Sequence, residues 1–375
     1  KRNAQTMTKT YFPAAGSDWE RQEPAAAGFD ATALQAAVDH AISHETGWDR
    51  DIMKVLTEGH FEPPPYNEIL GPVRERGGPN GLILKGGRIV AEWGDTSRAD
   101  MTFSVSKSYL SICAGLAVKK GLIRDIHAPI RELVKDGGFE SEQNRDITWH
   151  HLLQQTSEWE GTLWDKPDLL DRHRDLSSEG ANSKKGTHRD LQKPGSFWEY
   201  NDIRVNRLSL ALLRVLGEGL PAVLKREVMD PIGASQDWEW HGYRNSHVEI
   251  GGRQVQSVSG GGHWGGGMMI GSRDHARVGL MMANKGKWNG TEILPESWID
   301  ASLRPCDLQP IYGYMWWLNT DRKQYPSAPK TSFFAVGAGN SIIWMDPAHD
   351  LVAVVRWIAK PGIDGFCRRV MEAMR

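Results

Sequence analysis

The chain is poor in cysteine. Its 375 residues include only Cys113, Cys306 and Cys367, and their spacing matches no metal-binding pattern. A chain of this length can bury a sizeable core and does not need a disulfide framework to fold. We therefore expect a reduced interior, without structural disulfides and without a thiolate metal site.

Long apolar runs are also missing. No stretch of 18 apolar residues occurs, and the first residues, KRNAQTMTKTYFPAAG, lack the apolar core of a secretory signal. The sequence predicts a soluble protein that neither spans nor anchors to a membrane. Because the chain begins with Lys1 and not with Met, a removed signal stays open. The cytoplasm is slightly favoured, and the periplasm or secretion is the alternative.

An excess of charge of one sign is absent as well. Lys and Arg number 45 and Asp and Glu 47, which gives a formal net charge of -2. Such a chain has no whole-molecule attraction for nucleic acid or for anionic membranes. We expect a small-molecule partner, and the sequence does not predict the oligomeric state.

Strand-like segments are present near both ends of the chain. A helix is predicted at Ala31–Ser43, after the capping residue Asp30. Residues 81–93, GLILKGGRIVAEW, predict a β-hairpin. From Ser104, the segment SVSKSYLSICAGLAVKKGLI has apolar residues at helical spacing and few charges, which predicts a buried helix.

The middle of the chain is charged and helix-like, and strands return after it. Helices are predicted at residues 149–155, 206–216 and 220–229, and a further one from a capping Ser272 to about Gly286. Aromatic and β-branched runs predict strands at residues 313–318, 333–336, 341–345 and 351–358.

This order of elements predicts an α+β fold, an antiparallel sheet flanked by helices with an inserted, mostly helical domain. Residues 1–124 and 250–375 would form the sheet domain, and residues 125–249 the helical domain. We expect the active site in the cleft between them.

Ser104 and Lys107 are the strongest catalytic candidates. A three-residue separation on a helix puts hydroxyl and amine on one face, within reach of each other. Serine needs a base, and lysine serves if burial and the positive helix N-terminus depress its pKa toward neutrality. Backbone N–H groups at that terminus would also meet a developing oxyanion. The alternative is a capping serine with a solvated lysine.

A second S-x-x-K sequence occurs at residues 327–330, SAPK, where the proline and its surroundings predict a loop. The helix that follows Ser104 is apolar on both sides of its motif, so Lys107 lies where desolvation would lower its pKa. Ser104 is therefore the preferred nucleophile.

Several ordered motifs follow Ser104-Val105-Ser106-Lys107. They are PGSFWEYND, which contains Tyr200, then GGGMMIGSRDHARVGLMMANKGKWNGTEILPESWI and FFAVGAGNSIIWMDP. In this order they resemble the S-x-x-K, the PG-x-x-x-x-Y-x-N, the glycine pair with its helix, and the K-T-G or H-x-G strand of the serine β-lactamase and penicillin-binding-protein superfamily. The likeness is greatest to its class C-like branch, which includes family VIII esterases and 6-aminohexanoate-dimer hydrolase-like enzymes.

The resemblance implies roles and a β-lactamase/transpeptidase-like fold. Tyr200 would share proton transfer with Lys107, near the Ser104 hydroxyl and the leaving group. The backbone N–H groups of Ser104 and Ala338 would form the oxyanion hole, with Gly337 in support. An acyl-enzyme would form and be hydrolysed with no metal and no organic cofactor. The alternative for Tyr200 is a core aromatic with a satisfied hydroxyl.

One departure from the family concerns Asp202, which stands where the family usually has Asn. If Asp202 lies near Lys107, its carboxylate favours the protonated amine and weakens lysine as a base. Tyr200 would then be the main proton acceptor. Two alternatives stay open: Asn201 takes the role of the amide, or Asp202 points away.

A second departure is the triplet Ala335-Val336-Gly337, which lacks the cation of Lys-Thr-Gly or His-x-Gly. In the family that lysine helps to hold the carboxylate of β-lactams and of peptide termini. We therefore expect weak or no β-lactam hydrolysis and a neutral ester or amide substrate.

Other candidates carry less. Trp159, Trp164 and Trp264 are candidates to line an acyl or aryl pocket, with core burial as the alternative, which is favoured for Trp316 and Trp317. The pair His150-His151 and the lone His263 lack a second ligand at metal spacing, so structural roles are expected. The glycines of residues 260–267 predict close backbone packing and not a phosphate loop.

The sequence therefore predicts a serine hydrolase, a carboxylesterase first and an amidase second. One alternative is a non-turnover penicillin-recognising sensor or scaffold on the same fold, which Asp202 and Ala335 keep open. Another is a D-amino-acid peptidase, which the missing strand lysine disfavours.

Overall fold

A six-stranded antiparallel sheet organises one half of the molecule, as the computed structural model shows for residues 9–59, 62–176 and 182–375. Its order is β11-β12-β13-β14-β1-β2. The strands are β1 (Asn80–Lys85), β2 (Arg88–Trp93), β11 (Trp317–Leu318), β12 (Phe333–Gly337), β13 (Ser341–Asp346) and β14 (Leu351–Arg356). Since β1 pairs with β14, the two ends of the chain build one sheet, as the sequence predicted.

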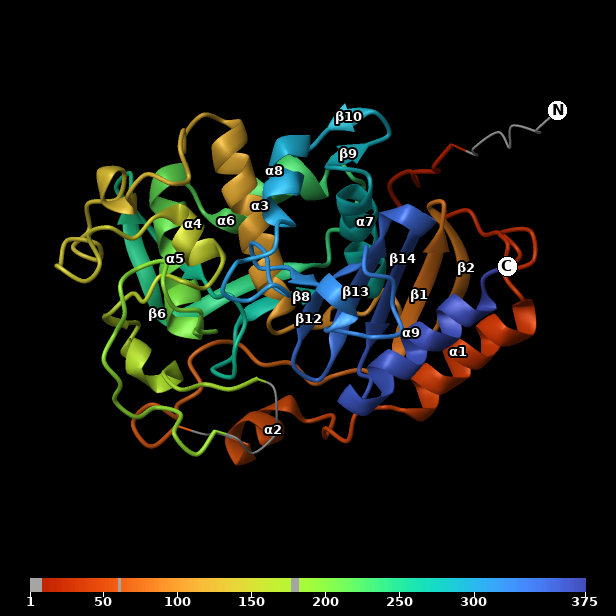
Figure 1. The fold of residues 1–375 in the computed structure, drawn as a ribbon, viewed down its shortest axis with the longest axis horizontal. Coiled ribbons are helices and arrows are strands. Elements are labelled where there is room, and N and C mark those ends of the chain that lie inside the picture. Colours follow the sequence, from red (N-terminus) through yellow and green to blue (C-terminus); the bar gives the residue numbers. More distant parts are fainter. Residues whose placement is uncertain (1–8, 60–61, 177–181) are drawn as a thin grey trace.

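Helices cover both faces of this sheet (Figure 1). The terminal helices α1 (Ala31–Ser43) and α9 (Ile363–Ala373) pack against each other on one face, and α7 (Ser272–Ala283) lies against β13 and β14. Asp30 caps α1 by accepting a hydrogen bond from the Ala33 amide at 2.9 Å. The predicted first helix, its cap and the hairpin are confirmed.

Burial of both sheet faces explains the nearly continuous apolar strands. Leu82 and Leu84 of β1 belong to the core that includes α7, whereas Ile83 belongs to the core beneath α1 and α9. Successive side chains of a strand point to opposite faces, so a strand covered twice needs apolar residues at every position.

The other half of the molecule is built around α3 (Val105–Lys119), which is buried on all sides. Helix α3 contacts α5 (Asp202–Leu216) and α6 (Leu220–Leu224) on one side and strand β12 on the other. In Figure 1 it stands between the helical part and the large sheet. A helix that is apolar all round needs such a position, and its first residues therefore lie where the two halves meet.

Smaller elements complete this half. A second sheet has the order β3-β8-β6-β7, and two short hairpins pair β4 with β5 and β9 with β10. These elements are β3 (Asp100–Met101), β4 (Thr162–Leu163), β5 (Lys166–Pro167), β6 (Glu239–Ile250), β7 (Arg253–Val258), β8 (Gly267–Ile270), β9 (Lys287–Trp288), β10 (Thr291–Glu292), α2 (Ile52–Glu58), α4 (Trp149–Leu153) and α8 (Glu296–Ser302).

The α+β fold with antiparallel sheets and flanking helices is confirmed, and some details differ from the prediction. Ser272 is not a helix cap: Gly271 is the N-cap of α7, and the Ser272 hydroxyl donates to Asn80 Oδ1 at 2.5 Å. The strand predicted at residues 313–318 shrinks to β11, because Met315 has a positive φ of 64°. Strand β6 falls inside the predicted helical insertion, and the division into two domains stays a prediction.

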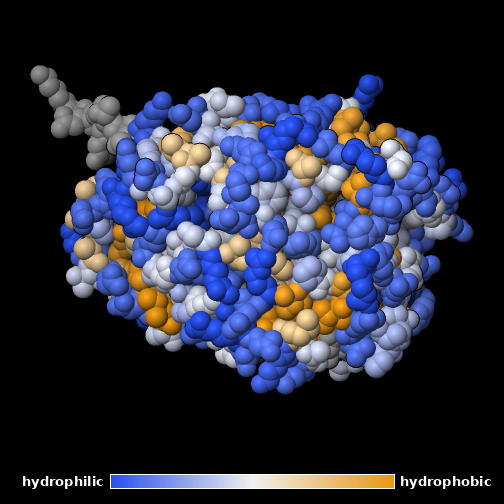
Figure 2. Space-filling view, turned by 180° about the vertical axis from the view of Figure 1, so that it is seen from behind, coloured by the Kyte–Doolittle hydropathy of each residue, from blue (hydrophilic) through white to orange (hydrophobic). Residues whose placement is uncertain are grey.

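Seen from behind, the surface is mainly hydrophilic with scattered apolar side chains (Figure 2). Among the described residues, no helix combines the length and the apolar character that crossing a bilayer requires. The three cysteines are free and buried.

Candidate active site

Ser104 occupies the N-cap position of α3, and its side chain makes no capping hydrogen bond. It follows Phe103, whose φ of 48° is unusual for a residue with a side chain and marks a sharp turn into the helix. The half-buried hydroxyl of Ser104 is thereby free to contact Lys107.

Lys107 lies one turn further along α3, with its Nζ 2.8 Å from Ser104 Oγ. The side chain is 2% exposed, and Nζ donates to the carbonyl oxygens of Gly261 at 2.8 Å and Gly260 at 3.2 Å. Asp202 Oδ1 is also 2.8 Å from Nζ. Four oxygens therefore surround a nitrogen that, as an ammonium, carries three protons.

The glycine-rich segment after β7 lets these carbonyls approach the lysine. Gly261 has a φ of +73°, and a Cβ there would lie 1.9 Å from the carbonyl oxygen of Phe103. The Gly260 amide is held by Asn206 Oδ1 at 3.0 Å. Close backbone packing, as the sequence predicted for this segment, shapes the cradle of Lys107.

Asp202 is the first residue of α5 and bridges two cations. Its Oδ1 faces Lys107, and its Oδ2 accepts from Arg174 NH1 at 2.9 Å. Burial alone would raise the pKa of Asp202, but Lys107 and Arg174 outweigh burial and hold that pKa well below its usual value. Asp202 therefore points toward the lysine, and the alternative that it points away is wrong.

The expectation that the pKa of Lys107 is depressed is also wrong. Burial lowers the pKa of Lys107, but the Asp202 carboxylate, together with Tyr200, raises it by more. The net result is a pKa above the ordinary value of lysine, so the resting amine is an ammonium. Lys107 can thus donate to the Ser104 oxygen, whereas its capacity to accept the serine proton is weakened.

Asn201 does not take the role of the family's amide. It is the N-cap of α5, where Oδ1 accepts from the amides of Ile203 and Arg204, and its Nδ2 donates to the Asp168 carbonyl at 3.0 Å. With donor and acceptor engaged and the residue fully buried, Asn201 positions α5 and has nothing left for a substrate.

Tyr200 immediately precedes that cap and is 4% exposed. Lys107 Nζ lies 5.0 Å from its ring centroid, and Trp317 stacks on the ring at 6.0 Å. Among the described residues, no group hydrogen-bonds to the phenol hydroxyl. The alternative of a core tyrosine with a satisfied hydroxyl does not describe this residue.

Gly337, the last residue of β12, lies against the start of α3. A Cβ on Gly337 would be 2.1 Å from the Thr102 carbonyl oxygen and 3.2 Å from the Ser104 amide nitrogen. Within the described part of the chain, neither the Ser104 amide nor the amide of the exposed Ala338 donates to an acceptor. Ala335, which the resemblance predicts at the family's cation position, is completely buried.

The predicted tryptophan pocket is not formed as expected. Trp159 and Trp264 are buried, and their indole N–H groups donate to the carbonyls of Gly138 at 2.7 Å and Tyr66 at 2.8 Å. Trp164 is half-buried in the β4–β5 turn. Trp159 and Trp264 are thus core side chains. Trp317, for which the sequence favours core burial, is half-buried beside Tyr200.

The histidines have structural partners. His151 Nδ1 accepts from the Thr148 amide at 3.1 Å, and His150 contacts the Tyr314 hydroxyl. Burial lowers the pKa of each of these two histidines to about 4. His263 lies 2.8 Å from Glu62 Oε1. Residues 9–59, 62–176 and 182–375 contain no group of three or more side chains suited to hold a metal ion.

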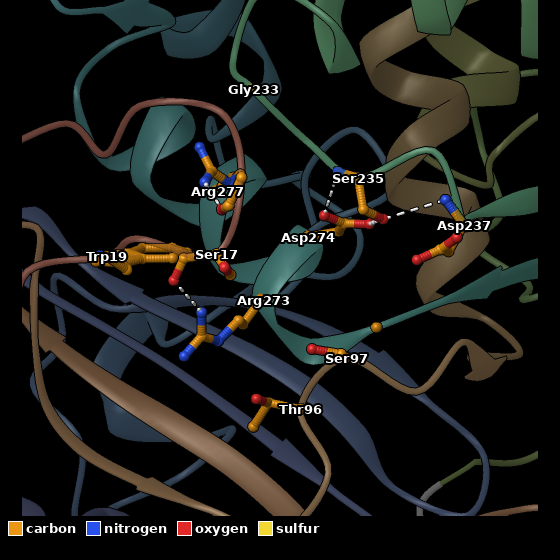
Figure 3. Close-up of a pocket in the computed structure, with 12 residues that line it drawn as sticks. Ser17, Trp19, Thr96, Ser97, Gly233, Ser235, Asp237, Arg273, Asp274 and Arg277 are labelled. Carbon is orange, nitrogen blue, oxygen red and sulfur yellow. Dashed lines mark hydrogen bonds between the residues drawn. The ribbon is translucent and has the colours of Figure 1, made fainter.

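A cavity of about 240 Å³ lies elsewhere, and neither Ser104, Lys107 nor Tyr200 lines it (Figure 3). It is formed by the N-terminal segment, the β2–β3 loop and the start of α7. Two of its charged groups already have partners: Asp274 accepts from the Ser235 amide and hydroxyl, and Arg273 donates to the Ser17 carbonyl at 3.0 Å.

Ser104, Lys107 and Tyr200 lie together at the N-terminus of the buried helix α3. A family model described as beta-lactamase matches residues 82–362. The chain belongs to the beta-lactamase family. The matched span contains all the candidate catalytic residues of this beta-lactamase-family chain.

Solved structures similar to this beta-lactamase-family chain have the same fold at low sequence identity. A penicillin-binding protein homologue from Caulobacter crescentus is 14% identical, with a TM-score of 0.57 over 87% of this chain and 98% of that chain. EstCE1, a hydrolase with promiscuous acyltransferase activity, is 17% identical, with a TM-score of 0.54 over 91% and 99%.

A D-stereospecific amidohydrolase from Streptomyces sp. is 15% identical, with a TM-score of 0.53 over 79% of this chain and 93% of that chain. The comparison with curated proteins gave no match. The fold and the family are therefore shown, and at these identities the similar structures carry no specific activity over to this beta-lactamase-family chain.

Proposed function

We propose that this chain is a serine hydrolase that acts through an acyl-enzyme on small esters or amides, with carboxylesterase activity first and amidase activity second. The observation that carries the proposal is the 2.8 Å contact between Ser104 Oγ and Lys107 Nζ on one face of α3. Two structurally similar proteins, the hydrolase EstCE1 and the D-stereospecific amidohydrolase, support hydrolytic chemistry on this fold.

In the proposed acylation, Ser104 Oγ attacks the substrate carbonyl carbon and forms a tetrahedral intermediate. The serine proton passes to the oxygen of Tyr200, acting as phenolate, because the ion-paired Lys107 is already protonated. Tyr200 then gives this proton to the departing alcohol or amine. A water molecule repeats the sequence on the acyl-serine and releases the acid.

Lys107 keeps two roles in this scheme. Its ammonium donates to Ser104 Oγ and stabilises negative charge that develops there, and its charge lies 5.0 Å from the ring centroid of Tyr200, the group that moves the proton. The amides of Ser104 and Ala338, which donate to no acceptor in the described part of the chain, would receive the carbonyl oxygen as an oxyanion. Gly337 supports this hole, since any side chain at that position would fill the space beside the Ser104 amide.

The substrate is proposed to be neutral at its acyl end. Strand β12 places the buried Ala335, and no cation, at the position where the family commonly has lysine or histidine. A carboxylate-bearing β-lactam would therefore lack the charged contact that the family uses to hold it.

Hydrolysis of p-nitrophenyl butyrate by the wild type and by Ser104→Ala tests the proposal. Turnover that Ser104→Ala abolishes supports it, and equal turnover by both proteins overturns it. Ser327→Ala is the matched control, since Ser327 begins the second S-x-x-K sequence but binds Asp364 through its amide and hydroxyl. We expect this control to keep full activity. A stable acyl adduct without turnover would instead support a non-turnover sensor.

A further inference from the structure

Arg174 completes a charged arrangement around Tyr200. Its NH1 lies 2.9 Å from Asp202 Oδ2, while Lys107 Nζ lies 2.8 Å from Oδ1 of the same carboxylate. The guanidinium carbon of Arg174 and Nζ of Lys107 are each 5.0 Å from the Tyr200 ring centroid. Two cations therefore share one buried carboxylate and flank one phenol.

A second carboxylate fixes Arg174 in this place. Asp171 Oδ2 lies 3.4 Å from Arg174 NH1 and accepts from the Asp202 amide at 2.7 Å. Lys185 Nζ, 3.3 Å from Asp171 Oδ1, compensates the charge of that carboxylate. The Arg174 side chain is 17% exposed, so its contacts are largely shielded from solvent and the charge acts at short range.

We propose that Arg174 is a positioning residue for the hydrolysis proposed above: it holds Asp202 against Lys107 and adds positive charge beside Tyr200. The inference rests on the proposed function. Arg174 acts through Asp202 and Tyr200, and no contact with a reacting atom is assigned to it.

The sign of its electrostatic effect is opposite to that of Asp202. Arg174 lowers the pKa of Lys107, so removing this cation makes Lys107 retain its proton to higher pH. Removing the Asp202 carboxylate makes Lys107 release its proton at lower pH, since Asp202 is the largest of the interactions that oppose the effect of burial on the pKa of Lys107. The other titratable or charged groups that face this set are Asp171, Lys185, His263, Tyr243 and Tyr312.

Two substitutions therefore break the same ion pair with opposite consequences. In Arg174→Gln, we expect the acidic limb of kcat/KM for p-nitrophenyl acetate to move up by about one pH unit. In Asp202→Asn, we expect the same limb to move down by a similar amount. A purely structural salt bridge would lower the rate in both variants without separating their pH profiles.

Matched variants keep the test decisive. Arg214→Gln removes a different ion-paired arginine, which lies on α5 and binds Asp136. Arg214 is twelve residues after Asp202, about 18 Å along the helix. We expect the acidic limb of kcat/KM for Arg214→Gln to coincide with that of the wild type. Arg174→Lys retains the charge and should keep the limb within about half a pH unit, and it serves if Arg174→Gln does not fold.

The outcomes separate the inference from the proposed function. If the wild type shows no Ser104-dependent hydrolysis, the proposed function fails and this inference fails with it. If hydrolysis depends on Ser104 but Arg174→Gln and Asp202→Asn shift the limb in the same direction, or Arg174→Gln leaves it unmoved, only the inference is overturned. If Arg174→Gln does not fold, the test uses Arg174→Lys. An acidic limb of kcat/KM displaced by a full pH unit in Arg174→Lys then overturns the inference.

Discussion

Lys107 and Asp202 form a buried ion pair, with Nζ and Oδ1 2.8 Å apart and neither side chain more than 4% exposed. The pair lies directly beneath the Ser104 hydroxyl and fixes the charge of the only amine in contact with it among the described residues. In the proposed mechanism, proton transfer is therefore governed by an interaction that the Asn of the usual family motif would not provide.

Loss of this ion pair should appear in pH-dependent stability. Asp202 has a pKa lowered below 3.8, so its contribution is present above that value and is lost as the pH falls through the still lower folded pKa. We expect Asp202→Asn to reduce the free energy of unfolding at pH 7 by roughly 3 kcal/mol. Urea unfolding should show this difference shrinking below about pH 4. A difference that is constant down to pH 2.5 would contradict the assignment.

Tyr200→Phe should separate catalysis from stability. Because the hydroxyl has no partner among the described residues, its removal should change the free energy of unfolding by less than about 0.5 kcal/mol. It should lower kcat roughly 10²- to 10⁴-fold, as expected for loss of a proton-transfer group. Thermal melting and ester hydrolysis measure the two effects.

The control for this prediction is Tyr109→Phe. The buried Tyr109 hydroxyl is hydrogen-bonded to His275 Nδ1 at 2.8 Å and, among the described residues, to none of Ser104, Lys107 and Tyr200. We expect it to lose about 1 kcal/mol of stability and to keep its activity. A stable, fully active Tyr200→Phe would remove the tyrosine from the mechanism.

Gly337→Ala should impair the proposed oxyanion hole. The added methyl would lie 2.1 Å from the Thr102 carbonyl and 3.2 Å from the Ser104 amide, so β12 must move away from α3. We expect kcat for p-nitrophenyl butyrate to fall by about 10-fold or more. Gly47→Ala is the control, since nothing lies within 4 Å of a Cβ there. Equal activity of both variants would argue against the hole.

The buried Ala335 predicts discrimination against β-lactams. We expect kcat/KM for a chromogenic cephalosporin to be at least about 100-fold lower than kcat/KM for p-nitrophenyl butyrate, because the substrate carboxylate finds no cation on β12. Initial rates measured with both substrates on one preparation settle the ratio. Comparable values would show that another cation holds the carboxylate.

The fold could be predicted well where residue patterns are periodic. Successive side chains of β1 enter two different cores, and α3 is apolar because it is buried. Both kinds of burial can be recognised in the sequence from its hydrophobic residues. Strand β6 was missed because polar residues interrupt it, and β11 was overestimated because a positive φ at Met315 carries no composition signal.

The site could be predicted only where its residues belong to ordered motifs. Ser104, Lys107 and Tyr200 lie in such motifs, whereas Arg174 comes from an irregular turn that no spacing connects to Asp202. The tryptophans show the same limit. The sequence makes Trp159 a pocket candidate and favours the core for Trp317, whereas tertiary packing buries Trp159 in the core and leaves Trp317 beside Tyr200.

The most direct test of the central claim is intact-mass spectrometry of the protein after treatment with a fluorophosphonate, followed by peptide mapping. We expect a single adduct on the peptide that contains Ser104, its loss in Ser104→Ala and its retention in Ser327→Ala. An adduct on another residue, or equal labelling of Ser104→Ala, would contradict the assignment of Ser104 as the nucleophile.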